Sequence, residues 1–176
     1  MILDRLFRPR PAKFAGETLY GRAVEQARLP HLYRELQVPD TVEGRFEAYS
    51  MHVFLLLDRL RGQGPQAAET SQVLFDTYLG GLDDALREMG IGDLSVGKKM
   101  RKLGEAFYGR VKSYEAALQS LPDPSELNGL LARTVYDGAA NAPLNEMADY
   151  VLAQRAALAV NAIDDLVAGT VTWASS

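Results

Sequence analysis

The sequence predicts an all-α protein, a single-domain bundle of about seven helices around one buried central helix, residues 41–61. Apolar residues recur through the chain at spacings of three and four, which is the periodicity of a helical face. No stretch competes with the alternating apolar pattern that is typical of a half-buried strand. Proline and glycine residues separate the periodic stretches, and 176 residues suit one domain of ordinary size.

The central helix is predicted by its start signal and by its composition. Pro39-Asp40-Thr41 is turn chemistry, and the side chain of Asp40 or Thr41 can accept from the first free amides of a helix. The stretch that follows is apolar nearly all round, so we expect it to be buried rather than to lie on a surface. It is too short and too charged at its ends to span a bilayer. Its polar exceptions are Arg45, His52, Asp58 and Arg59.

The other helices are placed by their apolar spacing and by the residues that start and stop them. Gly80-Gly81 inside one of them suggests that another backbone approaches closely, or that the helix is kinked. We expect a helical domain over residues 14–168, after an N-terminal segment, 1–13, and before a loose tail, 169–176, which Trp173 could anchor. The expected helices cover residues 14–28, 30–36, 41–61, 65–89, 95–119, 125–136 and 143–168.

Composition excludes several classes of function. The net charge of −4 gives no global basic field that would draw DNA. The chain has no cysteine and two histidines without metal-ligand spacing, so we expect neither a thiolate site nor a bound metal or cofactor. No run of about 20 apolar residues predicts a transmembrane helix, and no signal-peptide pattern follows Met1. We therefore expect a cytoplasmic protein.

The N-terminal segment, residues 1–13, combines apolar and basic side chains in one short amphipathic stretch. One interpretation is a foot that adheres reversibly to an anionic membrane surface and makes the protein peripheral at the inner membrane. The other is a frayed terminus that docks on the core. The candidate membrane-contact residues are Ile2, Leu3, Arg5, Leu6, Phe7, Arg8 and Arg10.

Charge changes sign between two consecutive helices. Residues 76–93 are mostly acidic, and the helix 95–119 that follows is basic outside its apolar stripe. A basic face of this kind is either an ordinary solvated surface or a docking surface, and Tyr108 lies beside the stripe. The candidate partner-binding residues are Arg45, Lys98, Lys99, Arg101, Lys102, Tyr108, Arg110 and Lys112.

An ordered series of short motifs runs through about residues 20–140. These motifs are Leu32-Tyr33, Val38-Pro39-Asp40-Thr41, Gly44-Arg45-Phe46-Glu47, His52, Leu56-Leu57-Asp58-Arg59-Leu60, Leu86-Arg87-Glu88-Met89-Gly90-Ile91-Gly92-Asp93-Leu94, Lys98-Lys99-Met100 and Ala106-Phe107-Tyr108-Gly109-Arg110. Together they resemble the ubiquinol–cytochrome c chaperone family, and the chain looks like a bacterial member because it has no long leader.

The resemblance implies an all-α assembly factor for ubiquinol–cytochrome c reductase, the respiratory complex III. Mitochondrial members of the family bind newly made cytochrome b near the ribosomal tunnel exit, together with a small partner protein. The partners implied for this chain are therefore nascent cytochrome b and the ribosome. Whether a small partner protein takes part in a bacterial setting is left open.

Two other functions remain as alternatives. Polar residues within an apolar helix could mark an enzyme, or a protein that binds a small apolar molecule, with Arg45, His52 and Asp58 in one pocket. The basic helix, residues 98–112, could instead be a ribosome- or RNA-binding module. No catalytic motif stands out, so we expect that the protein is not an enzyme.

Overall fold

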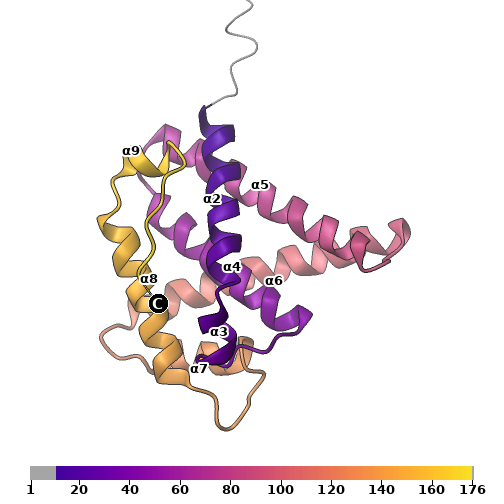
Figure 1. The fold of residues 1–176 in the computed structure, drawn as a ribbon, viewed down its shortest axis with the longest axis vertical. Helices are drawn as coiled ribbons and strands as arrows, with labels where there is room; N and C mark the ends of the chain where they lie inside the picture. The colour runs from indigo at the N-terminus through magenta and orange to yellow at the C-terminus, as the bar shows by residue number, and fades with distance from the viewer. Residues whose placement is uncertain (1–10, 176) are drawn as a thin grey trace, which may run out of the picture.

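The structure is a computed structural model that describes residues 11–175, without the side chain of Leu94. Within that range it consists of α-helices joined by short connections and contains no strand, which confirms the predicted all-α single domain (Figure 1). The proposed membrane-contact residues lie outside the described part of the chain. The helices are α2 (Pro11–Ala27), α3 (Pro30–Arg34), α4 (Val42–Leu60), α5 (Pro65–Glu88), α6 (Asp93–Gln119), α7 (Ser125–Thr134), α8 (Leu144–Val160) and α9 (Ile163–Leu166).

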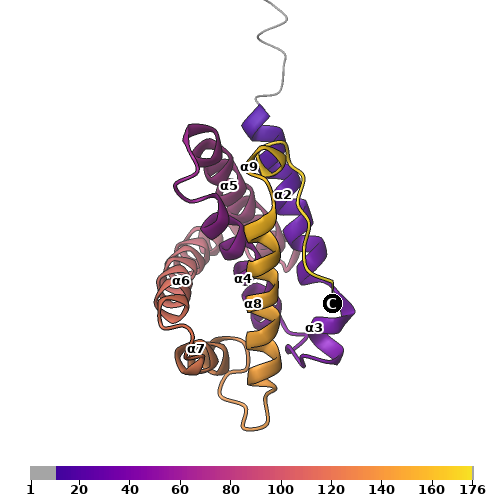
Figure 2. The ribbon, with the colours of Figure 1, turned by 90° about the vertical axis from the view of Figure 1, so that its left-hand side faces the viewer.

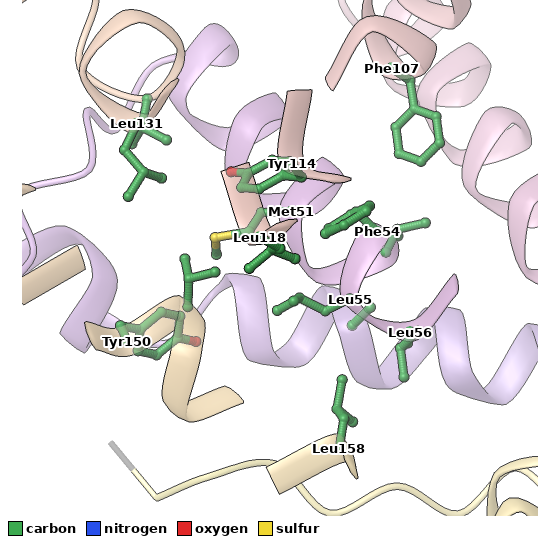
Figure 3. Close-up of a cluster of buried hydrophobic side chains, with 14 of the residues drawn as sticks. Met51, Phe54, Leu55, Leu56, Phe107, Tyr114, Leu118, Leu131, Tyr150 and Leu158 are labelled. Carbon is green, nitrogen blue, oxygen red and sulfur yellow. The ribbon is translucent and has the colours of Figure 1, made fainter. Parts of the chain in front are cut away.

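Helix α4 is the buried centre of the bundle, as the sequence predicted. Its first turn is capped by Thr41, whose Oγ1 accepts from the amide of Gly44 at 3.1 Å. Helices α2, α5, α6 and α8 all pack against it. Figure 3 shows the core that results, in which Phe54 lies against Tyr114 with stacked rings 4.9 Å apart. Most apolar side chains of α4 are therefore buried, although Val42 is exposed and Phe46, Tyr49 and Leu57 are only partly buried.

Helices α2 and α5 pack closely because two glycines lie at their contact. A Cβ added to Gly16 of α2 would lie 2.6 Å from the side chain of Val73, and one added to Gly81 of α5 would lie 2.1 Å from the hydroxyl of Tyr20. Nothing lies within 4 Å of the corresponding point at Gly80. At Gly81 the close neighbour is thus the side chain of Tyr20, not the backbone whose approach the glycine pair suggested.

Helices α5 and α6 form a hairpin whose outer half projects from the body of the molecule (Figure 1). Gly90 ends α5 with a φ of +78°, the left-handed conformation that favours glycine. Within α5, Arg87 donates to Asp83 at 2.6 Å. Across the turn, Arg87 also binds Asp93 at the start of α6. The outer half is thus held by two helices and a few exposed charges.

The predicted helix 143–168 is wrong in its last part, because α8 ends at Val160 and the separate helix α9 follows. Asn161 takes an extended conformation with ψ of 131°. Its side chain donates to the carbonyl of Ala157 and also bonds the backbone of Thr172. The Asn161 side chain thus forms hydrogen bonds with backbone groups that would otherwise need partners from a continuing helix. This competition ends α8 and lets the chain turn.

The C-terminal segment also differs from the loose tail that we expected. Residues 170–175, called the strap below, run back along α8 toward the middle of the bundle (Figures 1 and 2). Side-chain amides of α8 and of Asn161 hold the strap by its backbone. The anchoring role suggested for Trp173 agrees with its ring contact to His52.

Candidate functional site

His52 is a satisfied core residue that links three helices. Its Nδ1 lies 2.8 Å from the carbonyl oxygen of Ala48, so Nδ1 carries the proton, and Nε2 accepts from the hydroxyl of Tyr150 at 2.8 Å. That hydroxyl in turn accepts from Gln26 of α2 at 3.1 Å. Full burial lowers the pKa of His52 to about 4, so the imidazole is neutral near pH 7.

The pocket proposed for the enzyme or small-molecule alternative is wrong, because the structure separates its three residues. Arg45 is exposed at the start of α4, where it donates to Asp40 at 2.6 Å. Asp58, at the other end of α4, binds Arg155 of α8 at 3.2 Å. His52 is enclosed between them. No two of these three side chains line the same cavity.

Arg110 is tied into the bundle rather than presented on a free basic face. Its guanidinium binds the carboxylate of Glu47 on α4 in a bidentate arrangement, with Nε and Nη2 donating at 2.7 to 3.0 Å. The side chain of Glu47 is only 6% exposed and that of Arg110 29%. Hydrogen bonding by Glu47 raises the pKa of Arg110, which strengthens the charge of the guanidinium. Its position indicates a clamp between α4 and α6.

The other basic residues of α6 lie at the surface. Among the described residues, no carboxylate comes within 4.0 Å of any of their charged groups. At about 100° per residue they spread over more than one side of the helix, so they do not form a single stripe. Arg101 and Lys112 share the side of Tyr108. The exposed set comprises Lys98, Lys99, Arg101, Lys102 and Lys112.

Tyr108 borders an apolar groove of about 390 Å³ between the C-terminal end of α4, the first half of α5 and the middle of α6. Its ring is 59% exposed and lies 5.7 Å from that of Phe75. Phe107, the neighbouring residue, is buried in the floor of the groove and packs against Tyr78. The apolar lining continues through Leu57, Leu60 and Val111.

The polar rim of the groove comes from the loop after α4. Arg61 lines the groove and binds Glu115 of α6 at 2.5 Å. We refer to the groove, with Tyr108 and Arg61 at its rim, as the Tyr108 groove. An open apolar surface with an aromatic rim and few charges suits an apolar polypeptide segment better than a small polar substrate.

Sequence reasoning found Tyr108 but missed the rest of the groove. Leu57, Leu60 and Phe75 carry only the signal of helical core positions, and the partial exposure of Leu57 and Phe75 depends on how α4, α5 and α6 pack together. Arg61 follows a helix end and gives no distinguishing pattern. Separately, every helix in residues 11–175 falls short of the length and apolarity that a membrane span requires.

Comparison with known proteins adds a family to this geometry. The family model described as ubiquinol-cytochrome C chaperone matches residues 34–173. Two curated proteins, each called ubiquinol-cytochrome c reductase complex assembly factor 1, are 25% identical over 164 residues, or 92% of this chain; they come from Mus musculus and Homo sapiens. The chain spans about half the length of these relatives, 55% and 54% respectively.

A solved structure agrees over nearly the whole chain. The crystal structure of the Cbp3 homolog from Brucella abortus matches with a TM-score of 0.87 and 36% identity, and the match covers 99% of this chain and 97% of that one. The family is one of chaperones rather than enzymes, in agreement with the sequence-based expectation. On these matches, the chain belongs to the ubiquinol–cytochrome c chaperone family.

Proposed function

We propose that this chain is an assembly chaperone for ubiquinol–cytochrome c reductase and that it binds an apolar segment of newly made cytochrome b. The names of the mouse and human relatives support the first part of the proposal. The Tyr108 groove is the single observation that supports the second, because it combines apolar walls with an exposed aromatic side chain.

The chemistry of the groove suits temporary binding. A volume of about 390 Å³ accommodates a few apolar side chains, not a whole helix, so contact with the client is local. The ring of Tyr108 offers apolar area together with a hydroxyl that stays in water. A chaperone must also release its client, and a shallow groove with a wet rim gives a modest affinity that permits release.

The exposed basic side chains of α6 support a second, compatible contact with the ribosome. Lys98, Lys99 and Lys102 lie on the projecting half of α6, where acidic groups of a partner can reach them. Such binding would place the chaperone where cytochrome b emerges, at the cytoplasmic face of the membrane. Arg45 and Arg110 are weaker candidates for this contact, because each already binds a carboxylate within the chain.

A photo-crosslinking amino acid placed at position 108 tests the client site. We expect it to capture cytochrome b in cells that are assembling the reductase. The matched control is position 14, because Phe14 is an aromatic residue of nearly equal exposure, 57% against 59% for Tyr108, on helix α2, which contributes no residue to the lining of the groove. Equal capture of cytochrome b from both positions, or capture from neither, would contradict the proposed site.

Charge reversal tests the ribosome contact separately. A variant with Lys98→Glu, Lys99→Glu and Lys102→Glu should fold normally, since exposed substitutions usually change stability by about 0.5 kcal/mol or less each. It should lose co-sedimentation with ribosomes at low salt, and added salt should do the same to the unaltered chain. Normal co-sedimentation of the folded variant would remove this part of the proposal and leave the client site intact.

A further inference from the structure

Two amide side chains hold the strap by its backbone. The side chain of Asn161 accepts from the amide of Thr172 at 2.8 Å and donates to the carbonyl of the same residue at 2.9 Å. The side chain of Gln154 repeats the arrangement at Ala174, accepting at 2.9 Å and donating at 3.3 Å. Each amide therefore binds both the N–H and the C=O of one strap residue.

Hydrogen bonds of this kind suit any extended peptide, because they contact its backbone and depend little on its side chains. In an extended chain, residues two apart turn their N–H and C=O groups to the same side, as Thr172 and Ala174 do here. Gln154 and Asn161 stand about two helical turns apart and meet the strap in reverse order, so the strap runs antiparallel to α8. At these two positions the amides require only backbone groups.

Trp173 lies between these two residues, and its side chain points into the protein without filling the space there or pairing its indole N–H. Its ring packs edge-to-face on His52, with centroids 5.5 Å apart. Its buried indole N–H has no hydrogen-bond partner among the described residues, although buried donors are normally paired. A cavity of about 350 Å³ remains beside the strap, lined on its other side by Arg22, Glu25, Gln26 and Leu29.

We propose that the groove between α2 and α8 is a binding site for an extended segment of a partner protein, and that the strap occupies it in cis. The segment that fits has one aromatic side chain between two small residues, with free backbone N–H groups on both neighbours. The unpaired indole and the adjoining cavity leave room for an occupant that fits better than Trp173. This site is separate from the Tyr108 groove and does not depend on the client proposed for it.

The occupant is a partner segment and not the strap of a second copy, because the root of the strap is fixed. Thr170 donates its amide to Asp165 of α9 at 2.8 Å. Gly169 packs against α2, where an added Cβ would lie 3.2 Å from Thr18. Exchange of straps between copies would require these contacts to break, whereas a partner segment needs only the residues after Thr170 to leave.

Binding of a labelled peptide tests the proposal in the full chain. The probe is a fluorescent peptide with the sequence of residues 170–176, Thr-Val-Thr-Trp-Ala-Ser-Ser. A Trp173→Ala variant keeps the groove but weakens the binding of its own strap there. We expect the peptide to bind this variant at least about tenfold more tightly than the unaltered chain, where a tethered strap competes at a millimolar effective concentration. Fluorescence polarisation measures the difference.

Two controls distinguish binding at this site from non-specific binding of the peptide. Adding Gln154→Leu to Trp173→Ala should abolish binding, because it removes two of the backbone hydrogen bonds. A peptide with alanine in place of its tryptophan should bind neither protein. If Trp173→Ala does not fold, Ala174→Pro serves instead. This substitution removes the backbone N–H that donates to the side chain of Gln154, and it leaves the groove unchanged.

Three results would overturn the proposal. The folded variant could fail to bind the peptide, or could bind it no better than the unaltered chain does. The Gln154→Leu substitution could leave binding unchanged. Sedimentation could also show that the unaltered chain forms dimers which Trp173→Ala abolishes, in which case a second copy occupies the groove.

Discussion

The central helix α4 and the outer half of the α5–α6 hairpin are both built from regular helices, but they are stabilised in opposite ways. Four helices surround α4, and most of its apolar side chains are buried. At the tip of the hairpin, Met89 is 55% exposed, and the link across the turn is made by Arg87 with the exposed Asp93. The comparison indicates that stability resides in α4, while the outer half of the hairpin is exposed and carries the lysines proposed above for the ribosome contact.

The largest effect is expected from a cavity in the centre. Phe54→Ala should lower the free energy of unfolding by about 3–5 kcal/mol, because the ring is fully buried and stacks on Tyr114. Urea denaturation measures this. Met89→Ala is the control from the hairpin tip and should change the same quantity by about 0.5 kcal/mol or less. Similar losses in both variants would contradict the contrast between the two regions.

The clamp between α4 and α6 should have the next largest effect. Arg110→Met should destabilise the protein by about 3 kcal/mol, since it leaves the carboxylate of Glu47 buried and unpaired. Adding Glu47→Gln should recover part of this loss, because no buried charge then remains. A double-mutant cycle gives the coupling energy of the pair. Purely additive losses would mean that the two side chains do not stabilise each other.

Acid should weaken the centre through His52. Its pKa is lowered from 6.5 to about 4 in the folded chain, so the unfolded chain binds the proton more tightly. The stabilisation is fully present above pH 6.5 and is lost as the pH falls toward 4. Between pH 7 and 5 the unaltered chain should therefore lose about 2 kcal/mol more than His52→Gln does. Parallel pH profiles of the two proteins would show that His52 is not neutral in the fold.

The smallest effect is expected at the hairpin turn. Arg87→Ala removes the links to Asp83 and Asp93, but ion pairs of an exposed side chain contribute little to stability. We expect faster amide hydrogen exchange in the residues around the turn, with unchanged exchange in α4. Loss of protection in α4 as well would mean that the hairpin and the centre unfold as one unit.

Local patterns in the sequence predicted most of the fold. The spacing of apolar residues placed α4 and α6 within two residues of their bounds, and the Thr41 cap was visible as turn chemistry. The end of α8 was missed because Asn161 stops the helix through bonds to Thr172, which lies in a segment without a periodic pattern. That contact depends on the tertiary arrangement and leaves no local signal.

The candidate site was predicted less well, for the same physical reason. Tyr108 could be found because it lies beside an apolar stripe on its own helix. Arg110 was counted with the exposed basic residues, since its partner Glu47 lies 63 positions away and on another helix. The Tyr108 groove is also formed by parts of three helices, so no single stretch of sequence indicates its outline.

The four hydrogen bonds that hold the strap bear on how this protein is handled in the laboratory. They bind only backbone groups, of Thr172 and Ala174, so anything joined next to the strap is mechanically coupled to α8 through them. An affinity tag or fluorescent protein placed directly beside the strap would therefore load these bonds. Reporters intended for partner searches are better placed away from the strap, since a neighbouring fusion could itself change which proteins are captured.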